Sequence, residues 1–442
     1  MRLRYGYLPR ASGQRYSPQR AGPRPQVEAL LKQLPRQIEY SSEQTEAIRT
    51  ALTSKSLVLT GGPGTGKTTT VQGILQLMEK LDWKVLLAAP TGRAAKRLSE
   101  ATGRQAKTIH RLLGFQPPRG FEHDDERPLD ADALVVDEVS MVDTVLMNHL
   151  VKAIPSKAHL VLVGDVDQLP SVGAGNVLKD LIASGAIPVV RLTQIFRQAQ
   201  QSFIVVNAHR VNQGKLPHLK ADPKSDFFFL EEDDPEQAAE LIAQLVAERL
   251  PKHYGLDPLD DIQVLAPMYR GAVGADSLNR LLQERLNPGE PLNLPYAGRR
   301  FRLGDKVMQI VNDYEKDVFN GDIGRIVRLD GENQRVMVQF PDREPVPYEP
   351  ADLSELVLAY AVTIHKSQGS EYRAVVMPIH TQHYVMLQRN LLYTALTRGR
   401  KMVILVGSRK ALAIAVKNVK TASRFTRLCS RVAKPSSKAS DS

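Results

Sequence analysis

A glycine-rich stretch behind a short apolar run constrains this chain more than any other feature. Residues 57–59 (Leu-Val-Leu) lead into residues 61–68 (Gly-Gly-Pro-Gly-Thr-Gly-Lys-Thr), which follow the pattern G-x-x-x-x-G-K-T. In this pattern backbone N–H groups surround an anion, the lysine reaches the β- and γ-phosphates of a nucleotide, and the final hydroxyl can bind Mg²⁺. The stretch therefore predicts a phosphate-binding loop.

The residues on either side fit this interpretation. Residues 56–60 predict a buried strand, and Val71, Ile74, Leu75 and Met78 recur at the spacing of one helical face. Strand, loop and helix N-terminus follow one another in the order that a phosphate site requires. A glycine-rich turn that matches by chance is the alternative, and these flanks disfavour it.

Length and composition indicate a multidomain globular protein. The chain has 442 residues, of which 42% are hydrophobic, so we expect about two to four domains. No apolar run is long enough to cross a bilayer, and the N-terminus has no signal-like apolar region. The single Cys429 cannot form an internal disulfide. We predict a cytoplasmic protein with no membrane partner.

The formal net charge of +11 lies in the two ends of the chain. Residues 1–36 hold eight Lys or Arg and one Glu, and residues 421–442 hold five Lys or Arg and one Asp. We expect a mostly disordered basic extension over 1–36 and a partly disordered basic tail over 421–442. Such tails suit a polyanionic partner, but they are equally typical of solvated chain ends.

A second apolar strand, residues 133–136, ends in the carboxylates of Asp137 and Glu138. Phosphoryl transfer needs one carboxylate for Mg²⁺ and one to orient and deprotonate the attacking water. A third strand, 159–163, leads into residues 164–170 (Gly-Asp-Val-Asp-Gln-Leu-Pro). Because ligands of open α/β sheets collect at the carboxyl ends of the strands, these polar groups are expected at one edge.

The second half of the chain predicts another α/β unit with an all-β insertion. Residues 297–355 change to short alternating segments punctuated by glycines, which indicates a small antiparallel barrel. Residues 356–362 are expected to form a strand that resumes the α/β pattern.

Eight strings in order resemble the motif series of superfamily 1 helicases, and in detail the RecD-like DNA helicases of the 1B branch. They are residues 61–70, 89–98, 107–113, 135–143, 163–175, 192–198, 360–372 and 391–400. The likeness is to a short form of that family, because long forms carry a sizeable region ahead of the motor. It implies an α/β fold with two RecA-like P-loop NTPase domains, 37–198 and 199–420, and an SH3-like β-barrel inserted in the second.

The resemblance also implies roles for individual residues, with ATP and Mg²⁺ as cofactors. The adenine would meet Gln44 and the ribose Glu371. The expected phosphate-binding residues are Gly62, Pro63, Gly64, Thr65, Gly66, Lys67, Thr68 and Thr69. Thr68 and Asp137 would hold Mg²⁺. Glu138 would act as the base, Gln168 would sense the γ-phosphate, and Arg197 and Arg398 would approach that phosphate from the second domain.

The family pattern further suggests where a nucleic acid would bind. The candidate DNA contacts are Thr91, Arg93, Thr108, His110, Thr363, His365 and Lys366. An insertion at residues 114–130 resembles the strand-separating pin of the family. Its Pro and Gly residues favour a tight reversal, with Phe115 and Phe121 on the two arms.

Three functions remain open from the sequence. The first is an ATP-dependent helicase that moves 5′→3′ on single-stranded DNA and unwinds tailed duplexes in repair or recombination. The second is a superfamily 1 RNA helicase, and the third is an ATP-gated DNA remodeller that does not unwind. We expect a monomer, and the sequence assigns no protein partner.

Overall fold

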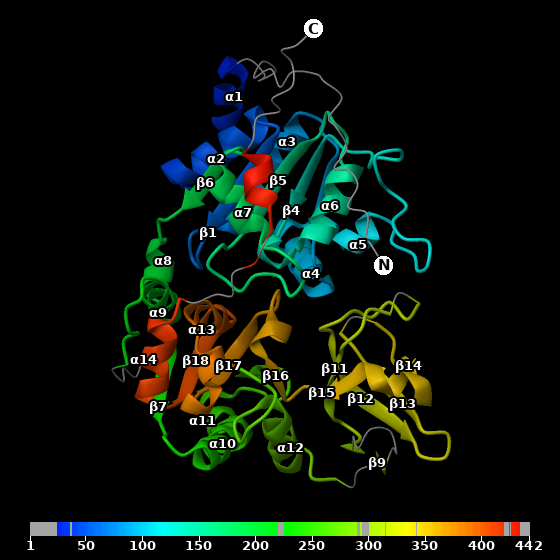
Figure 1. Ribbon diagram of the computed structural model, residues 1–442, viewed down its shortest axis with the longest axis vertical. Coiled ribbons are helices and arrows are strands. Elements are labelled where there is room, and N and C mark those ends of the chain that lie inside the picture. The colour runs from blue at the N-terminus through cyan, green and yellow to red at the C-terminus, as the bar shows by residue number, and fades with distance from the viewer. Residues whose placement is uncertain are drawn as a thin grey trace.

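The computed structural model describes residues 24–35, 38–219, 225–289, 292–293, 300–313, 315–341, 343–419, 424 and 426–433. Figure 1 shows two α/β lobes, with a β-barrel beside the second. In the described part of the chain, no helix combines the length and apolar character needed to cross a membrane.

The first lobe is built on six parallel strands in the order β3-β2-β4-β5-β1-β6. They are β1 (Ser56–Gly61), β2 (Val85–Ala89), β3 (Ala106–Thr108), β4 (Ala133–Val136), β5 (His159–Gly164) and β6 (Val189–Leu192). Leu57 and Leu59 pack into one core and Val58 into another. The sheet is thus covered on both faces, which is why its strands read as continuous apolar runs.

Helices and short loops cover this sheet. They are α1 (Arg24–Leu31), α2 (Ser42–Thr53), α3 (Lys67–Lys80), α4 (Gly92–Thr102), α5 (Ile109–Leu112), η1 (Val139–Met141), α6 (Thr144–Ala153) and α7 (Val177–Ser184). Ser41 caps α2 through a reciprocal pair of hydrogen bonds with Gln44, at 3.2 and 2.9 Å.

Helix α1 shows that part of residues 1–36, which were predicted to be a mostly disordered extension, is ordered. Val27 is buried, and Leu30, Leu31 and Leu34 pack against the same core. These four residues have the spacing i, i+3, i+4, i+7 of an amphipathic helix, a signal that the surrounding Arg and Pro residues obscured. Residues 1–23 lie outside the described part.

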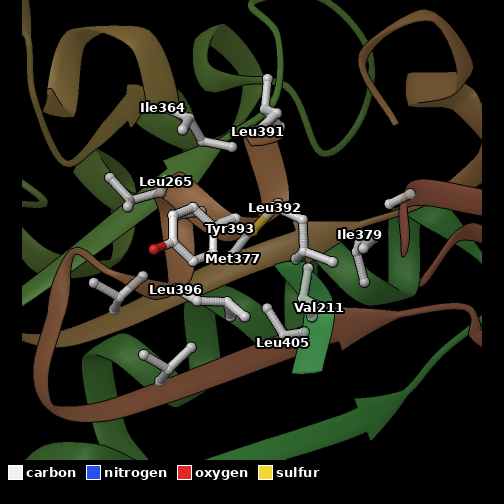
Figure 2. Close-up of a cluster of buried hydrophobic side chains, with 14 of the residues drawn as sticks. Val211, Leu265, Ile364, Met377, Ile379, Leu391, Leu392, Tyr393, Leu396 and Leu405 are labelled. Atoms are coloured by element: carbon white, nitrogen blue, oxygen red, sulfur yellow. The ribbon is translucent and has the colours of Figure 1, made fainter. Parts of the chain in front are cut away.

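The second lobe has five parallel strands in the order β16-β8-β17-β18-β7. They are β7 (Phe227–Glu231), β8 (Ile262–Ala266), β16 (Ala361–Thr363), β17 (Tyr372–Ile379) and β18 (Gly399–Gly407). The helical segments are α8 (Arg197–Gln200), α9 (Phe203–Asn212), α10 (Pro235–Gln244), the π-helical η2 (Leu245–Arg249), α11 (Leu250–Tyr254), α12 (Ala275–Leu286), η4 (Ile364–Ser367), η5 (Thr381–Met386), α13 (Arg389–Leu396) and α14 (Arg409–Lys417). Figure 2 shows part of the core between this sheet and α13.

An antiparallel sheet in the order β14-β13-β12-β11-β15 forms the barrel. It comprises β11 (Lys306–Gln309), β12 (Ile323–Asp330), β13 (Arg335–Gln339), β14 (Val346–Tyr348), η3 (Pro350–Glu355) and β15 (Leu356–Leu358), beside a ribbon of β9 (Leu292–Asn293) and β10 (Arg300–Phe301). The single strand predicted over 356–362 is wrong. Residues 356–358 pair with the barrel and 361–363 with the second sheet, because the chain changes sheets at Ala359 and Tyr360.

Residues 424 and 426–433 lie against the first lobe, so part of the predicted, partly disordered tail is ordered. Helix α15 (Leu428–Val432) lies beside α7, although α14 belongs to the second lobe (Figure 1). Arg424 donates to the carbonyl oxygens of Gly173 and Gly175 at 2.8 and 2.7 Å. Leu428 and Val432 pack against the first-lobe core, an apolar pair that the basic composition of the tail concealed. The α/β fold class with an inserted barrel is confirmed.

Candidate functional site

The predicted phosphate loop lies between the end of β1 and the start of α3. Gly66 precedes the helix with a positive φ of 80°. A Cβ at Gly66 would lie 2.4 Å from Nε2 of Gln44, so only glycine fits there. The Lys67 ammonium donates to the carbonyl oxygens of Gly61 and Gly62 at 2.6 and 3.1 Å. The loop thus has the helix N-terminus, the glycines and the cation that bind a phosphate.

The remaining loop residues are held by their neighbours. Thr65 Oγ1 donates to the Gly62 carbonyl at 2.9 Å, and His209 Nε2 of α9 lies 3.1 Å from the carbonyl oxygen of Pro63. A Cβ at Gly64 would lie 2.6 Å from Cβ of Ala199. Thr68 and Thr69 follow Lys67 in the first turn of α3. The second lobe therefore lies directly against the loop.

Gln44 is fully buried next to this loop. Its Oε1 accepts from the Ser41 N–H, and its Nε2 donates to the Gly66 carbonyl at 3.2 Å. The amide thus stabilises the loop entry in this structure. Contact with an adenine, which would use the second Nε2 hydrogen or replace these bonds, stays a prediction.

The two acidic residues after β4 lie together as predicted. Burial, and next the charge of Glu138, raise the pKa of Asp137 to about 6. The Glu138 N–H donates to Oδ1 of Asp137 at 2.8 Å, and the positive φ of Glu138, 53°, turns the chain away from the strand. Oxygen donors suit Mg²⁺, and a buried carboxylate beside a second one favours a bound cation, so Asp137 and Thr68 fit the expected metal ligands.

Arg97 is a site residue that the sequence analysis missed. Its guanidinium lies 3.9 Å from Oε1 of Glu138 and hydrogen-bonds to Oε1 of Glu371 in the second lobe. Arg400 Nε lies 3.6 Å from the other Glu371 oxygen. The signal was available, because Arg97 stands one helical turn after Arg93 in the string 89–98. A role for Glu371 at the ribose stays a prediction.

Arg398 is buried and joins the two lobes. It donates from Nη2 to Oε1 of Gln168 at 2.6 Å, and from Nη1 to the Ser370 carbonyl at 3.1 Å. The Leu169 N–H donates to Oγ1 of Thr394 at 2.8 Å beside this contact. The structure therefore brings the two predicted residues Gln168 and Arg398 together. Arg197 begins α8, and its side chain lies outside the described part.

A second contact between the lobes, Tyr393 with Asp165, was also missed. Tyr393 Oη donates to Oδ2 of Asp165 at 2.7 Å, and both side chains are buried. Burial raises the pKa of Asp165 and holds that of Tyr393 well above its usual value. Both residues lie within strings matched to the family, but nothing in their spacing showed that they meet.

Three candidate DNA contacts lie at the boundary between the first lobe and its neighbours. Arg93 Nη1 donates to Oγ of Ser370 at 3.0 Å, and a Cβ at Gly369 would lie 2.9 Å from Oγ1 of Thr91, which caps α4. Thr108 is buried and caps α5. A cavity of about 630 Å³ between the first lobe and the barrel is lined by Arg93 and Thr108. Its other basic lining residues are Lys96, Lys107, Arg111 and Arg343.

The other candidates are divided between separate places. Thr363 and Lys366 line a cavity of about 1000 Å³ between the second lobe and the barrel, and Lys366 donates to Oδ1 of Asn320 at 2.8 Å. Burial, and next the charge of Arg424, lower the pKa of His365. His110 lies at neither cavity, because its ring packs against Phe115 and Phe121.

The predicted pin is a tight reversal, but its aromatic residues do not project. Gln116 and Gly120 exchange two backbone hydrogen bonds of 2.8 Å. The rings of Phe115 and Phe121 lie 4.9 Å apart, and that of Phe121 lies 4.4 Å from His149 of α6. The two phenylalanines do lie on the arms that flank this reversal, but their rings pack toward α5 and α6. The exposed residues are those of the tip, 116–119.

Two parallel α/β lobes with a phosphate loop at their junction and a buried cation from the second lobe define a P-loop NTPase fold with two RecA-like domains. Three family models match: "AAA domain" over 44–174, "ATP-dependent RecD-like DNA helicase SH3 domain" over 278–340, and "UvrD-like helicase C-terminal domain" over 358–406.

Among curated relatives, the ATP-dependent RecD2 DNA helicase of Deinococcus radiodurans is 42% identical over 89% of this chain and 52% of its own length. The RecBCD enzyme subunit RecD of Mycolicibacterium smegmatis is 34% identical over 85% of this chain and 72% of its own. The chain belongs to the RecD-like DNA helicase family. It spans about half the length of the Deinococcus relative. The solved Pif1 helicase of Candida albicans is 20% identical, covers 87% of this chain and 97% of its own, and has a TM-score of 0.49.

Proposed function

We propose that this chain is an ATP-driven motor that moves 5′→3′ along single-stranded DNA and unwinds tailed duplexes in repair or recombination. The contact of Arg398 with Gln168 is the observation that carries the proposal. A cation from one lobe held by a polar residue of the other couples the approach of the lobes to phosphate chemistry. The names of the curated relatives support DNA rather than RNA, and the 5′→3′ direction follows from the family branch.

The roles within the site are those that the family resemblance implies, and the contacts described above support them. The loop around Lys67 would bind the β- and γ-phosphates of ATP, and Glu138 would orient and deprotonate the attacking water. Mg²⁺, when held by Thr68 and Asp137, supplies charge neutralisation of the phosphates. Arg398 would stabilise the charge that develops on the transferred phosphoryl group. Arg197 would act with it.

The nucleic acid would bind where the barrel faces the two lobes. The cavity between the barrel and the first lobe is lined by basic residues from both, and the cavity beside the second lobe contains Lys366. Lysine and arginine side chains supply most contacts to phosphates. A monomer would be sufficient, because one chain provides both lobes and the barrel.

The test is ATP turnover with single-stranded DNA or RNA of the same sequence, with Lys67→Ala as the negative control. We expect DNA to raise kcat more than RNA does. Equal or greater stimulation by RNA would favour the RNA helicase function instead, and turnover that ignores both would contradict a nucleic-acid motor.

A further inference from the structure

The hydroxyl group of Tyr393 is the only polar part of a side chain that otherwise belongs to the second-lobe core. Its ring lies among Leu265, Met377 and Leu396, and its oxygen is on the side of the ring opposite Met377 (Figure 2). That oxygen donates to Oδ2 of Asp165 at 2.7 Å, at the carboxyl end of β5 in the first lobe. A phenylalanine at this position would keep the apolar packing of the ring. The buried hydroxyl of Tyr393 therefore indicates a role at Asp165.

Asp165 belongs to a network of hydrogen bonds between the lobes. Its Oδ1 accepts from the Asp167 N–H at 3.0 Å, and its Oδ2 lies 3.4 Å from Nε2 of Gln168. Gln168 in turn accepts from Arg398 at 2.6 Å. Tyr393 and Arg398, from one segment, therefore hold Asp165 and Gln168, from another. Networks of this kind fix the orientation of every member.

This hydrogen-bond network lies directly against the phosphate loop. A Cβ at Gly62 would lie 3.1 Å from Oη of Tyr393. The Lys67 charge acts on Asp165, since it offsets part of the rise in pKa that burial causes.

We propose that Tyr393 is a positioning residue, which orients Asp165 and, through Gln168, aligns Arg398 when the lobes close. The proposal rests on the ATP-driven activity proposed above. It predicts that the hydroxyl affects the rate of hydrolysis rather than the binding of ATP, because the transition state depends on the position of Arg398.

Tyr393→Phe tests this, because it removes only the oxygen. The matched control is Tyr360→Phe, since Tyr360 is also buried and donates to an aspartate, Asp305, at 2.8 Å, but lies at the root of the barrel. For Tyr393→Phe we expect kcat at saturating single-stranded DNA to fall about 10- to 100-fold, the usual effect of removing a residue that orients a site. KM for ATP should stay within about twofold. Tyr360→Phe should retain the wild-type kcat per folded molecule, even if Tm falls.

The double variant Tyr393→Phe/Asp165→Asn separates a shared role from two independent ones. The losses in kcat caused by residues that act as a unit are not additive. We therefore expect the kcat of the double variant to be no lower than that of the less active of the two single variants, Tyr393→Phe and Asp165→Asn. Multiplied losses would overturn the proposal. So would a wild-type kcat in Tyr393→Phe, or equal losses in Tyr393→Phe and Tyr360→Phe. A wild-type chain without DNA-stimulated turnover would instead refute the proposed function, and the inference with it.

Discussion

Arg398 and Gln168 are 230 positions apart in sequence, yet Nη2 of the arginine lies 2.6 Å from Oε1 of the glutamine. Gln168 follows β5 of the first sheet, and Arg398 immediately precedes β18 of the second. The guanidinium also donates to two carbonyl oxygens of its own lobe, those of Ser370 and Thr394. It is therefore fixed at the junction and reaches the first lobe only while the lobes are close together.

Replacement of Arg398 by Ala should abolish most DNA-stimulated turnover. Cations delivered across an interface contribute about 10³–10⁵ in rate in other phosphoryl-transfer enzymes. Arg409→Ala, which removes an exposed arginine paired with Glu231, is the control and should match the wild type. Steady-state ATP hydrolysis at saturating DNA measures both. Full activity in Arg398→Ala would reduce the arginine to a structural role.

Lys67→Ala and Glu138→Gln should both stop hydrolysis but differ in nucleotide binding. Loss of Lys67 removes a charge-assisted contact to phosphate, so the affinity for ATP should fall. Loss of the Glu138 base should leave ATP bound and unhydrolysed. Equilibrium binding of ATP with Mg²⁺ distinguishes the two. Hydrolysis at the wild-type rate by Glu138→Gln would show that the base lies elsewhere.

In the hairpin, the exposed tip replaces the two phenylalanines as the part that we expect to separate the strands. Replacement of Pro117, Pro118 and Arg119 by a Gly-Ser-Gly tip should spare single-strand-stimulated ATP turnover and eliminate strand displacement, if the exposed tip separates the strands. Phe121→Ala is the contrasting variant. It should lower the free energy of unfolding by roughly 2 kcal/mol, because its half-buried ring packs on the first-lobe core. Unwinding that survives the new tip would assign strand separation to the barrel.

His383 should make the stability of the protein depend on pH. Its side chain is buried, and among the described residues neither ring nitrogen has a hydrogen-bond partner. Burial, and next the charge of His380, lower its pKa to about 4. The unfolded chain, with a histidine pKa near 6.5, binds the proton first as the pH falls. The stability that the protein gains from keeping His383 neutral is therefore fully present above about pH 6.5, and it is lost as the pH falls toward 4.

Unfolding in urea measures this effect. Between pH 7.5 and 5 the wild type should lose roughly 2 kcal/mol more than His383→Leu, which cannot titrate. The difference between the two proteins isolates His383 from the other histidines. Equal losses would show that His383 is protonated in the folded state as readily as in the unfolded one.

Local sequence patterns predicted the structural features that depend only on residues close together in the chain. The phosphate loop, the carboxylates after β4 and the change of period at the barrel were evident, because glycine spacing and apolar periodicity are properties of short segments. The change from one sheet to another within residues 356–362 was not evident, because both halves of this segment are apolar. Only tertiary pairing assigns them to different sheets.

Contacts between distant segments could not be predicted in the same way. Nothing in the spacing of residues 165 and 393 shows that a tyrosine and an aspartate meet, nor that residues 426–433 return to the first lobe. The phenylalanines of the hairpin show the opposite case. Their position on the arms of a reversal could be predicted, but not that His110 and His149 on two helices provide a surface on which they pack.

ATP-dependent strand displacement on DNA and RNA duplexes that carry either a 5′ or a 3′ single-stranded tail distinguishes a 5′→3′ DNA helicase from the other functions. Glu138→Gln serves as the inactive control. We expect displacement of the DNA duplex with a 5′ tail, and none with the 3′ tail or with Glu138→Gln. DNA-stimulated hydrolysis without displacement of any duplex would contradict this expectation and leave an ATP-gated remodeller as the function.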